Sequence, residues 1–246
     1  MVKERIISVD IFRGLTIVLM ILVNTPGTWS NVYAPFLHAE WHGYTPTDLV
    51  FPFFLFIVGT SIAFAYSNKT TSPATYKKIT IRTLKLIGLG LFLGAFTIHF
   101  PFIKDFESIR FPGVLQRIGV VFFVAAILFI NFNWKALLGI CIAIVLGYWI
   151  WMGFIPIHGM EPTFDRAPNN WANYIDLNVI GTHMYKEDYD PEGLLSTLPS
   201  IATSLMGVFT GLILLSKRTQ KEFLLLGMGA VLVVAGHLWD LVFPIN

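Results

Sequence analysis

Residues able to perform acid–base chemistry gather in one stretch of the sequence. They are Asn24, His38, Glu40, His42 and Asp48. Histidine titrates near neutral pH, so it can serve as a general base or as a nucleophile. An amide can stabilise a developing oxyanion, and a carboxylate can hold an imidazole ring in one tautomer. The stretch therefore contains the groups that a base-catalysed reaction needs.

Two of these residues also have a structural explanation. Asn24 lies just before a Pro-Gly pair, where it can simply end a helix. The sequence TPTD at 45–48 resembles a capping box with proline at the first helical position. In that interpretation Thr45 caps the helix and Asp48 reaches back to it. The sequence leaves both explanations open beside the catalytic one.

The segment HAEWH at 38–42 also raises the question of a metal site. His38 and His42 are four residues apart and would share one face of a helix, as zinc-binding histidines do. Glu40 would lie on a different face, and no third ligand is close in the sequence. We therefore expect no bound metal.

Charged residues inside apolar sequence form a second group of candidates, because ionisable groups at membrane depth are costly. Arg13 lies one helical turn from Asp10, so an ion pair, snorkelling to the surface and ligand contact are all open. Arg117 lies deeper and can pair with a buried carboxylate or with a phosphate. His237 and Asp240, three residues apart, could form a histidine–carboxylate pair.

The elements that must position these residues follow from the composition. Of 246 residues, 55% are hydrophobic and 13% are charged, and the mean hydropathy is +0.67. A water-soluble domain could not cover its surface with so few charges. The formal net charge of +2, without a basic stripe, argues against nucleic-acid binding. Cys141 is the single cysteine, which excludes a disulfide framework.

Apolar runs predict an all-α bundle of transmembrane helices in one domain, residues 1–246. A long loop over 154–197, rich in proline and aromatic residues, should form an ordered extracytoplasmic cap. About seven spans are expected, over 9–25, 46–66, 79–98, 113–130, 135–153, 198–216 and 222–243.

The positions of lysine and arginine predict the orientation of the bundle. These residues concentrate before the first span, between the second and third, and between the sixth and seventh. In contrast, 26–45 has none, and 154–197 has two against seven acidic residues. The positive-inside rule then places the N-terminus in the cytoplasm. The predicted outer loops have no N-glycosylation sequon, which favours a bacterial inner membrane.

Five separated motifs, in this order, are similar to those of the heparan-α-glucosaminide N-acetyltransferase family of transmembrane acyltransferases. The resemblance covers the chain from Ser8 to the final FPIN. The motifs are SVDIFRG at 8–14, VN at 23–24, HAEWHGYTPTDLVFPFFLFIVG at 38–59, FPGVLQRIGV at 111–120 and YDPEG at 189–193.

The resemblance implies an enzyme that moves an acetyl group from cytosolic acetyl-CoA to an amino sugar across the membrane. It implies that His38 is the catalytic histidine and that Asn24 is an active-site residue. Position 42 is often asparagine in the animal enzymes and is histidine here, so the implied acceptor is in doubt. Family members also continue for several helices beyond FPIN, so the resemblance implies a fragment or a shortened member.

Further assignments combine this resemblance with the positions of the charged residues. Acetyl-CoA phosphates could meet Lys77 and Lys78 at the inner face, with Arg13 and Arg117 as further candidate ligands. Asp48 would orient His38, which acts as a base or as an acyl carrier. Lipid is the expected surrounding, and homo-oligomerisation is left open.

The competing interpretation is a secondary transporter of a small polar solute. Many spans, charges within them and the repeat of DLVFP at 48–52 and 240–244 support it. The polar residues, however, concentrate near one predicted face rather than along a path through the midplane. This distribution favours the enzyme.

Overall fold

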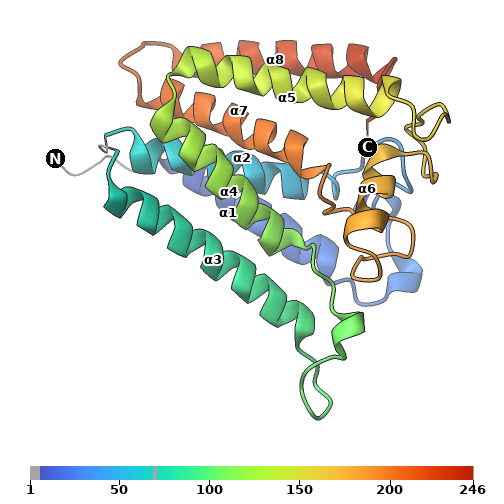
Figure 1. The fold of residues 1–246 in the computed structure, drawn as a ribbon. Coiled ribbons are helices and arrows are strands. Elements are labelled where there is room, and N and C mark those ends of the chain that lie inside the picture. Colours follow the sequence, from blue (N-terminus) through green and yellow to red (C-terminus); the bar gives the residue numbers. More distant parts are fainter. Residues whose placement is uncertain (1–5, 69–70, 246) are drawn as a thin grey trace.

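The computed structural model describes residues 6–68 and 71–245, and the chain folds into a bundle of helices (Figure 1). Seven helices are long and one, α6, is short. Their bounds are α1 Ile7–Asn24, α2 Val50–Tyr66, α3 Pro73–Ala95, α4 Val114–Asn131, α5 Trp134–Phe154, α6 Trp171–Val179, α7 Thr197–Leu215 and α8 Lys221–Asp240. The all-helical prediction is therefore confirmed.

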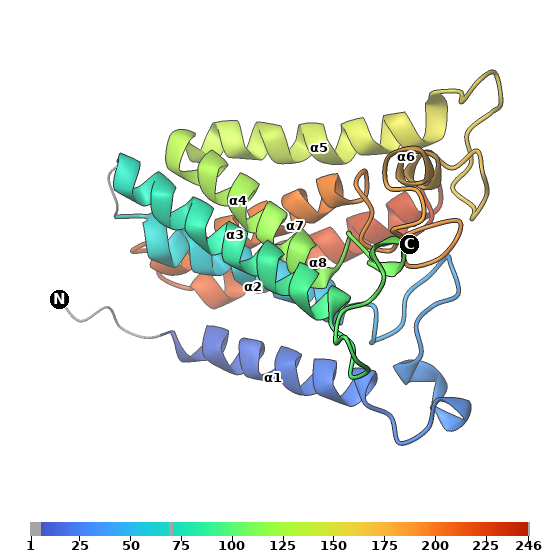
Figure 2. The ribbon, with the colours of Figure 1, turned by 60° about the horizontal axis from the view of Figure 1, so that its bottom comes forward.

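The long helices alternate in direction, so the connections collect at two ends of the bundle (Figures 1 and 2). We call one the turn end; it holds the short connections that follow α2, α4 and α7. We call the other the loop end. It holds 25–49, 96–113, 155–196 and 241–245. Asn24, His38 and Asp48 belong to the loop end.

The centre of the bundle is the pair formed by α2 and α7, whose backbones approach closely at small residues. A Cβ atom added to Gly59 would lie 1.8 Å from the carbonyl oxygen of Ser204. One added to Gly207 would lie 2.0 Å from that of Phe56. The Thr60 hydroxyl also donates to the Gly207 carbonyl at 3.1 Å. Such contacts are typical of helices that pack within a membrane.

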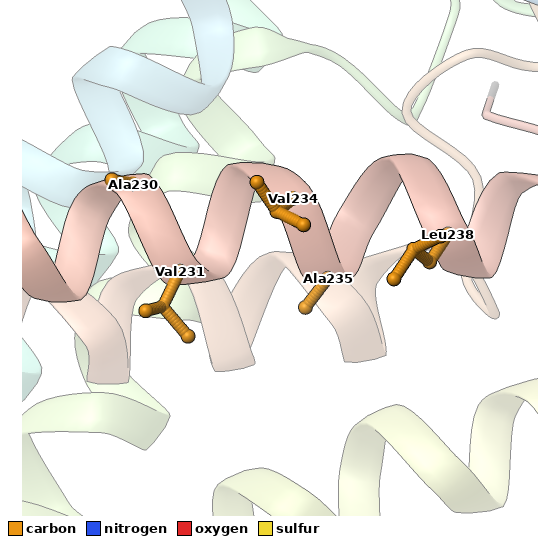
Figure 3. A pocket seen from close by; sticks show the side chains of 5 residues that line it. All are labelled: Ala230, Val231, Val234, Ala235 and Leu238. Atoms are coloured by element: carbon orange, nitrogen blue, oxygen red, sulfur yellow. The ribbon is translucent and has the colours of Figure 1, made fainter.

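The outer helices α1 and α8 have little buried surface. No residue of α8 is buried, and α1 buries only Thr16 and Val23. An apolar groove on α8 is lined by alanine, valine and leucine side chains alone (Figure 3). This surface suits lipid or another apolar helix and carries no group for acid–base chemistry.

Five helices in the described part of the chain are long and apolar enough to cross a membrane: α1, α4, α5, α7 and α8. The α2 helix is apolar but has 17 residues, and α3 carries four basic residues in its first thirteen positions. The structure therefore supports a helical membrane protein. The number of seven spans stays a prediction.

Several predicted boundaries are wrong. The second span was placed at 46–66, but 46–49 form a turn and the helix begins at Val50. The third was placed at 79–98, but the helix begins at Pro73, because the Ser72 side chain caps it by accepting from the Thr75 amide. The predicted loop over 154–197 contains α6, which the Asn170 side chain caps.

Candidate active site

The structure brings His38 and Asp48 together at the loop end. His38 Nδ1 lies 2.6 Å from Asp48 Oδ1. An ionised carboxylate can only accept, so Nδ1 carries the proton and the neutral ring has its lone pair on Nε2. The His38 side chain is 70% exposed. Nε2 is therefore a base or nucleophile that a reactant can reach.

Asp48 is itself held in place by three further hydrogen bonds. Its Oδ2 accepts from the Thr45 amide at 2.8 Å, from the Thr45 hydroxyl at 3.0 Å and from the Ala39 amide at 3.1 Å. Burial alone would raise the pKa of Asp48, but the bonds from His38, Thr45 and Ala39 outweigh it and lower the pKa. The carboxylate is thus ionised at neutral pH, with its orientation fixed.

The predicted reach of Asp48 back to Thr45 is present, but in a turn that precedes the helix. The two roles considered for Asp48, structural and histidine-orienting, coexist because each carboxylate oxygen serves one of them. The same carboxylate holds the backbone of the His38 segment through Ala39.

The histidines at 38 and 42 do not share a helical face, because this segment is irregular. His42 turns to another loop, with Nε2 2.8 Å from Asp165 Oδ1. Gly43 has φ +91° and donates its amide to the Ile245 carbonyl at 2.7 Å. Within residues 6–68 and 71–245 no three histidine, cysteine or acidic side chains are grouped to hold a metal.

Asn24 ends α1, as its structural interpretation predicts. Its side-chain Nδ2 donates to the Met20 carbonyl, one turn earlier, at 2.9 Å. No hydrogen bond joins it to His38 or Asp48 among the described residues. Nδ2 carries two hydrogens, so one remains for a ligand.

Arg117 is buried at the loop end of α4, with 8% of its surface exposed. Its guanidinium donates to the Gly193 carbonyl at 3.0 Å and to the Ser196 hydroxyl. It also lies 6.0 Å from the ring of Phe51, the second residue of α2. Nε of Arg117 has no hydrogen-bond partner in the described part of the chain.

The other three candidate cofactor ligands lie elsewhere. Arg13, on α1, pairs with Asp10 at 3.3 Å and donates to Ser61 on α2 at 3.1 Å. Lys77 and Lys78 are exposed in the first turns of α3, at the turn end. The four basic residues do not form one site.

The predicted pairing of His237 with Asp240 is wrong. His237 Nδ1 bonds to the Val233 carbonyl of its own helix at 2.9 Å. Asp240 instead accepts the Ile245 amide at 2.8 Å, because the chain turns back after α8.

A buried ion-pair network at the loop end was missed from the sequence. Arg110 binds both oxygens of Asp190 and also contacts Glu192. The Asp190 side chain is fully buried. Arg110 and Asp190 are 80 positions apart in the sequence. The sequence marks them only through two motifs: Arg110 precedes FPG at 111–113, and Asp190 and Glu192 belong to YDPEG at 189–193.

Comparison with known proteins identifies the family of the chain. The chain matches the family model described as heparan-alpha-glucosaminide N-acetyltransferase, catalytic, over residues 5–238. It is 31% identical to the human heparan-alpha-glucosaminide N-acetyltransferase, over 94% of this chain and 42% of that protein. Identity to the mouse protein of the same name is 30%, over 95% of this chain and 42% of the relative. The chain thus spans less than half the length of these relatives, and it belongs to the heparan-alpha-glucosaminide N-acetyltransferase catalytic family.

Proposed function

We propose that this chain transfers an acetyl group from cytosolic acetyl-CoA to the amine of an amino sugar on the opposite side of the membrane. The observation that carries the proposal is the His38–Asp48 pair, with a 2.6 Å contact at Nδ1 and an exposed ring. Family membership supplies the reaction class. The acceptor class comes from the name of the human and mouse relatives, which describes an N-acetyltransferase for a glucosaminide.

His38 Nε2 can serve the reaction in two ways. As a base, it takes a proton from the sugar amine while the nitrogen attacks the thioester carbonyl, and the C–S bond breaks to release CoA. As an acyl carrier, Nε2 attacks the carbonyl first and the C–S bond breaks to release CoA; the amine then attacks the acetyl group, the bond to the ring breaks, and the freed Nε2 takes the amine proton. In both routes Asp48 holds the ring and stabilises the positive charge that develops on it.

Asn24 is proposed to stabilise the oxyanion that forms at the carbonyl. Its second Nδ2 hydrogen has no acceptor among the described residues, and a single such donor contributes about 3 kcal/mol in known enzymes.

The donor is proposed to extend along the bundle, with its phosphates at the turn end. Lys77 and Lys78 are exposed there. Gly90, on the same helix, packs on Gln116, the neighbour of Arg117. Thirteen residues of helix separate Lys77 from Gly90, about 20 Å at 1.5 Å per residue. The basic groups are thus spaced for an elongated molecule that reaches from one end of the bundle toward the other.

The sidedness of the proposal rests on the lysine and arginine pattern, which makes the turn end cytoplasmic. Single cysteines at Asn68 and Glu187, both exposed, test it in a Cys141→Ser background. An impermeant thiol reagent applied to intact cells should label the cysteine at 187 and spare the one at 68. The reverse pattern, or equal labelling, would contradict the sidedness.

The activity itself is tested in proteoliposomes supplied with isotope-labelled acetyl-CoA on one side and glucosamine on the other. We expect labelled N-acetylglucosamine on the sugar side, detected by mass spectrometry. The transporter alternative predicts sugar uptake without acetylation. The repeat of DLVFP gives this alternative little support. The copy at 48–52 lies at the start of α2, whereas the copy at 240–244 follows the end of α8, so the two copies do not occupy equivalent positions.

A further inference from the structure

A cluster of charges that takes no part in the proposed acetyl-transfer step itself lies next to the His38 segment. It contains Arg110 and Arg117 and three carboxylates, Asp176, Asp190 and Glu192. Asp176 and Asp190 are 1% and 5% exposed. When every group is ionised, the cluster has one negative charge in excess.

Asp176, on α6, lies directly against the turn 189–194, which contains the YDPEG motif. Its Oδ1 accepts from the Leu194 amide at 2.8 Å. A Cβ atom added to Gly193 would lie 1.8 Å from Oδ2, so the carboxyl rests on the glycine backbone. The position of this turn therefore depends on the Asp176 carboxyl.

The groups that face Asp176 come from each neighbouring element. They are Arg117 on α4, Tyr148 on α5 and Asp190 in the turn. Burial raises the pKa of Asp176 to about 6, with the charge of Asp190 adding to the rise. The Leu194 amide and Arg117 oppose the rise without cancelling it.

The same turn touches the segment that carries the candidate catalytic histidine. Tyr189 packs edge-on against Trp41, with ring centroids 5.2 Å apart. Arg166 lies 4.5 Å from the Tyr189 ring. The Trp41 indole donates to the Phe164 carbonyl at 2.8 Å. Trp41 is three residues from His38, so the turn and the histidine segment share a packed contact.

We infer that Asp176 is a positioning residue. Its protonation determines the position of the turn 189–194, and this turn determines the position of the segment that carries Trp41 and His38. Burial disfavours the ionised Asp176 carboxyl, and the charge of Asp190 adds to this, so protonation favours the packed turn that buries the carboxyl over an open turn that exposes it to water. The turn should therefore pack more tightly at acidic pH. The role assigned to His38 rests on the proposed function, whereas the coupling between the two segments does not.

Hydrogen–deuterium exchange of the protein in nanodiscs tests the coupling at about pH 5 and pH 7.5, after correction for intrinsic exchange rates. We expect amides of 189–196 to be about tenfold better protected at the lower pH. Protection of the amides of 38–44 should also increase at the lower pH. Asp176→Asn should abolish the dependence on pH. Glu161→Gln, which alters an exposed carboxylate elsewhere at the loop end, is the matched control and should behave as wild type.

A pH step that persists in Asp176→Asn would overturn the inference, as would a step in 189–196 that 38–44 does not share. Absence of the step in the wild-type protein would overturn it however the variant folds. Acetyl transfer is followed in parallel. Loss of an inflection near pH 6 in Asp176→Asn, with transfer retained, supports the inference, and failure of transfer in wild type would affect only the proposed function.

Discussion

At the turn end, short connections join helices that are capped by their own neighbours, as Asn133 caps α5 and Ser72 caps α3. At the loop end, residues far apart in sequence hold long segments together, as in the Arg110–Asp190 pair and the His42–Asp165 pair. The difference indicates that the loop end is the part of the bundle suited to hold catalytic residues in place. These local caps only start helices, whereas long-range polar contacts can fix a histidine and a carboxylate against each other.

The largest expected effect on stability comes from breaking the buried pair at the loop end. Arg110→Met leaves the fully buried Asp190 carboxylate without its cation, which should cost about 3 kcal/mol of unfolding free energy. Arg166→Met removes an equally bidentate but exposed pair with Asp188 and should have no measurable effect. Denaturant unfolding in detergent measures both, and equal losses would show that burial does not distinguish them.

A smaller effect is expected from Asp176, and its sign depends on pH. The folded pKa of about 6 lies above the unfolded value of 3.8, so Asp176 favours the fold below pH 4 and this advantage is lost as pH rises to 6. Asp176→Asn should therefore be more stable than wild type at neutral pH, by about 1 to 2 kcal/mol. The gain should shrink toward pH 4. Thermal unfolding across this range gives the answer, and a gain that is constant with pH would refute the assignment.

The smallest effect on stability is expected at the turn end. Changing Lys77 and Lys78 together to glutamine should leave the unfolding temperature unchanged, because both side chains are exposed. Acetyl-CoA affinity should fall several-fold at low salt and less at high salt, since exposed charges are screened. Lys104→Gln combined with Lys186→Gln, both at the loop end, is the control for net charge. Unchanged affinity in the double variant would remove these lysines from the donor site.

The sequence predicted the long helices well because each is an apolar run bounded by charged or helix-ending residues. It could not predict the buried network, since nothing local links Arg110 to a carboxylate 80 positions away. The helical spacing expected for HAEWH failed for a related reason. Bonds from the Ala39 and Thr45 amides to Asp48 hold that segment in an irregular conformation.

The candidate site was predictable in part. The resemblance and the residue types predict His38 with Asp48 as its orienting carboxylate, and the structure shows the two side chains in contact through Nδ1. Motif and charge predict Asn24 and the basic residues as ligand contacts, and these roles stay predictions. Tertiary geometry, rather than sequence spacing, decides which of them can act together.

The most direct test of the central claim is single-turnover acetyl transfer by purified His38→Ala protein, from labelled acetyl-CoA to glucosamine. Removal of the Nε2 base should lower the rate by at least about 10²-fold while the protein stays folded, because the side chain is 70% exposed. His99→Ala, another exposed loop-end histidine, should transfer at the wild-type rate. Near-wild-type transfer by a folded His38→Ala protein would contradict the account.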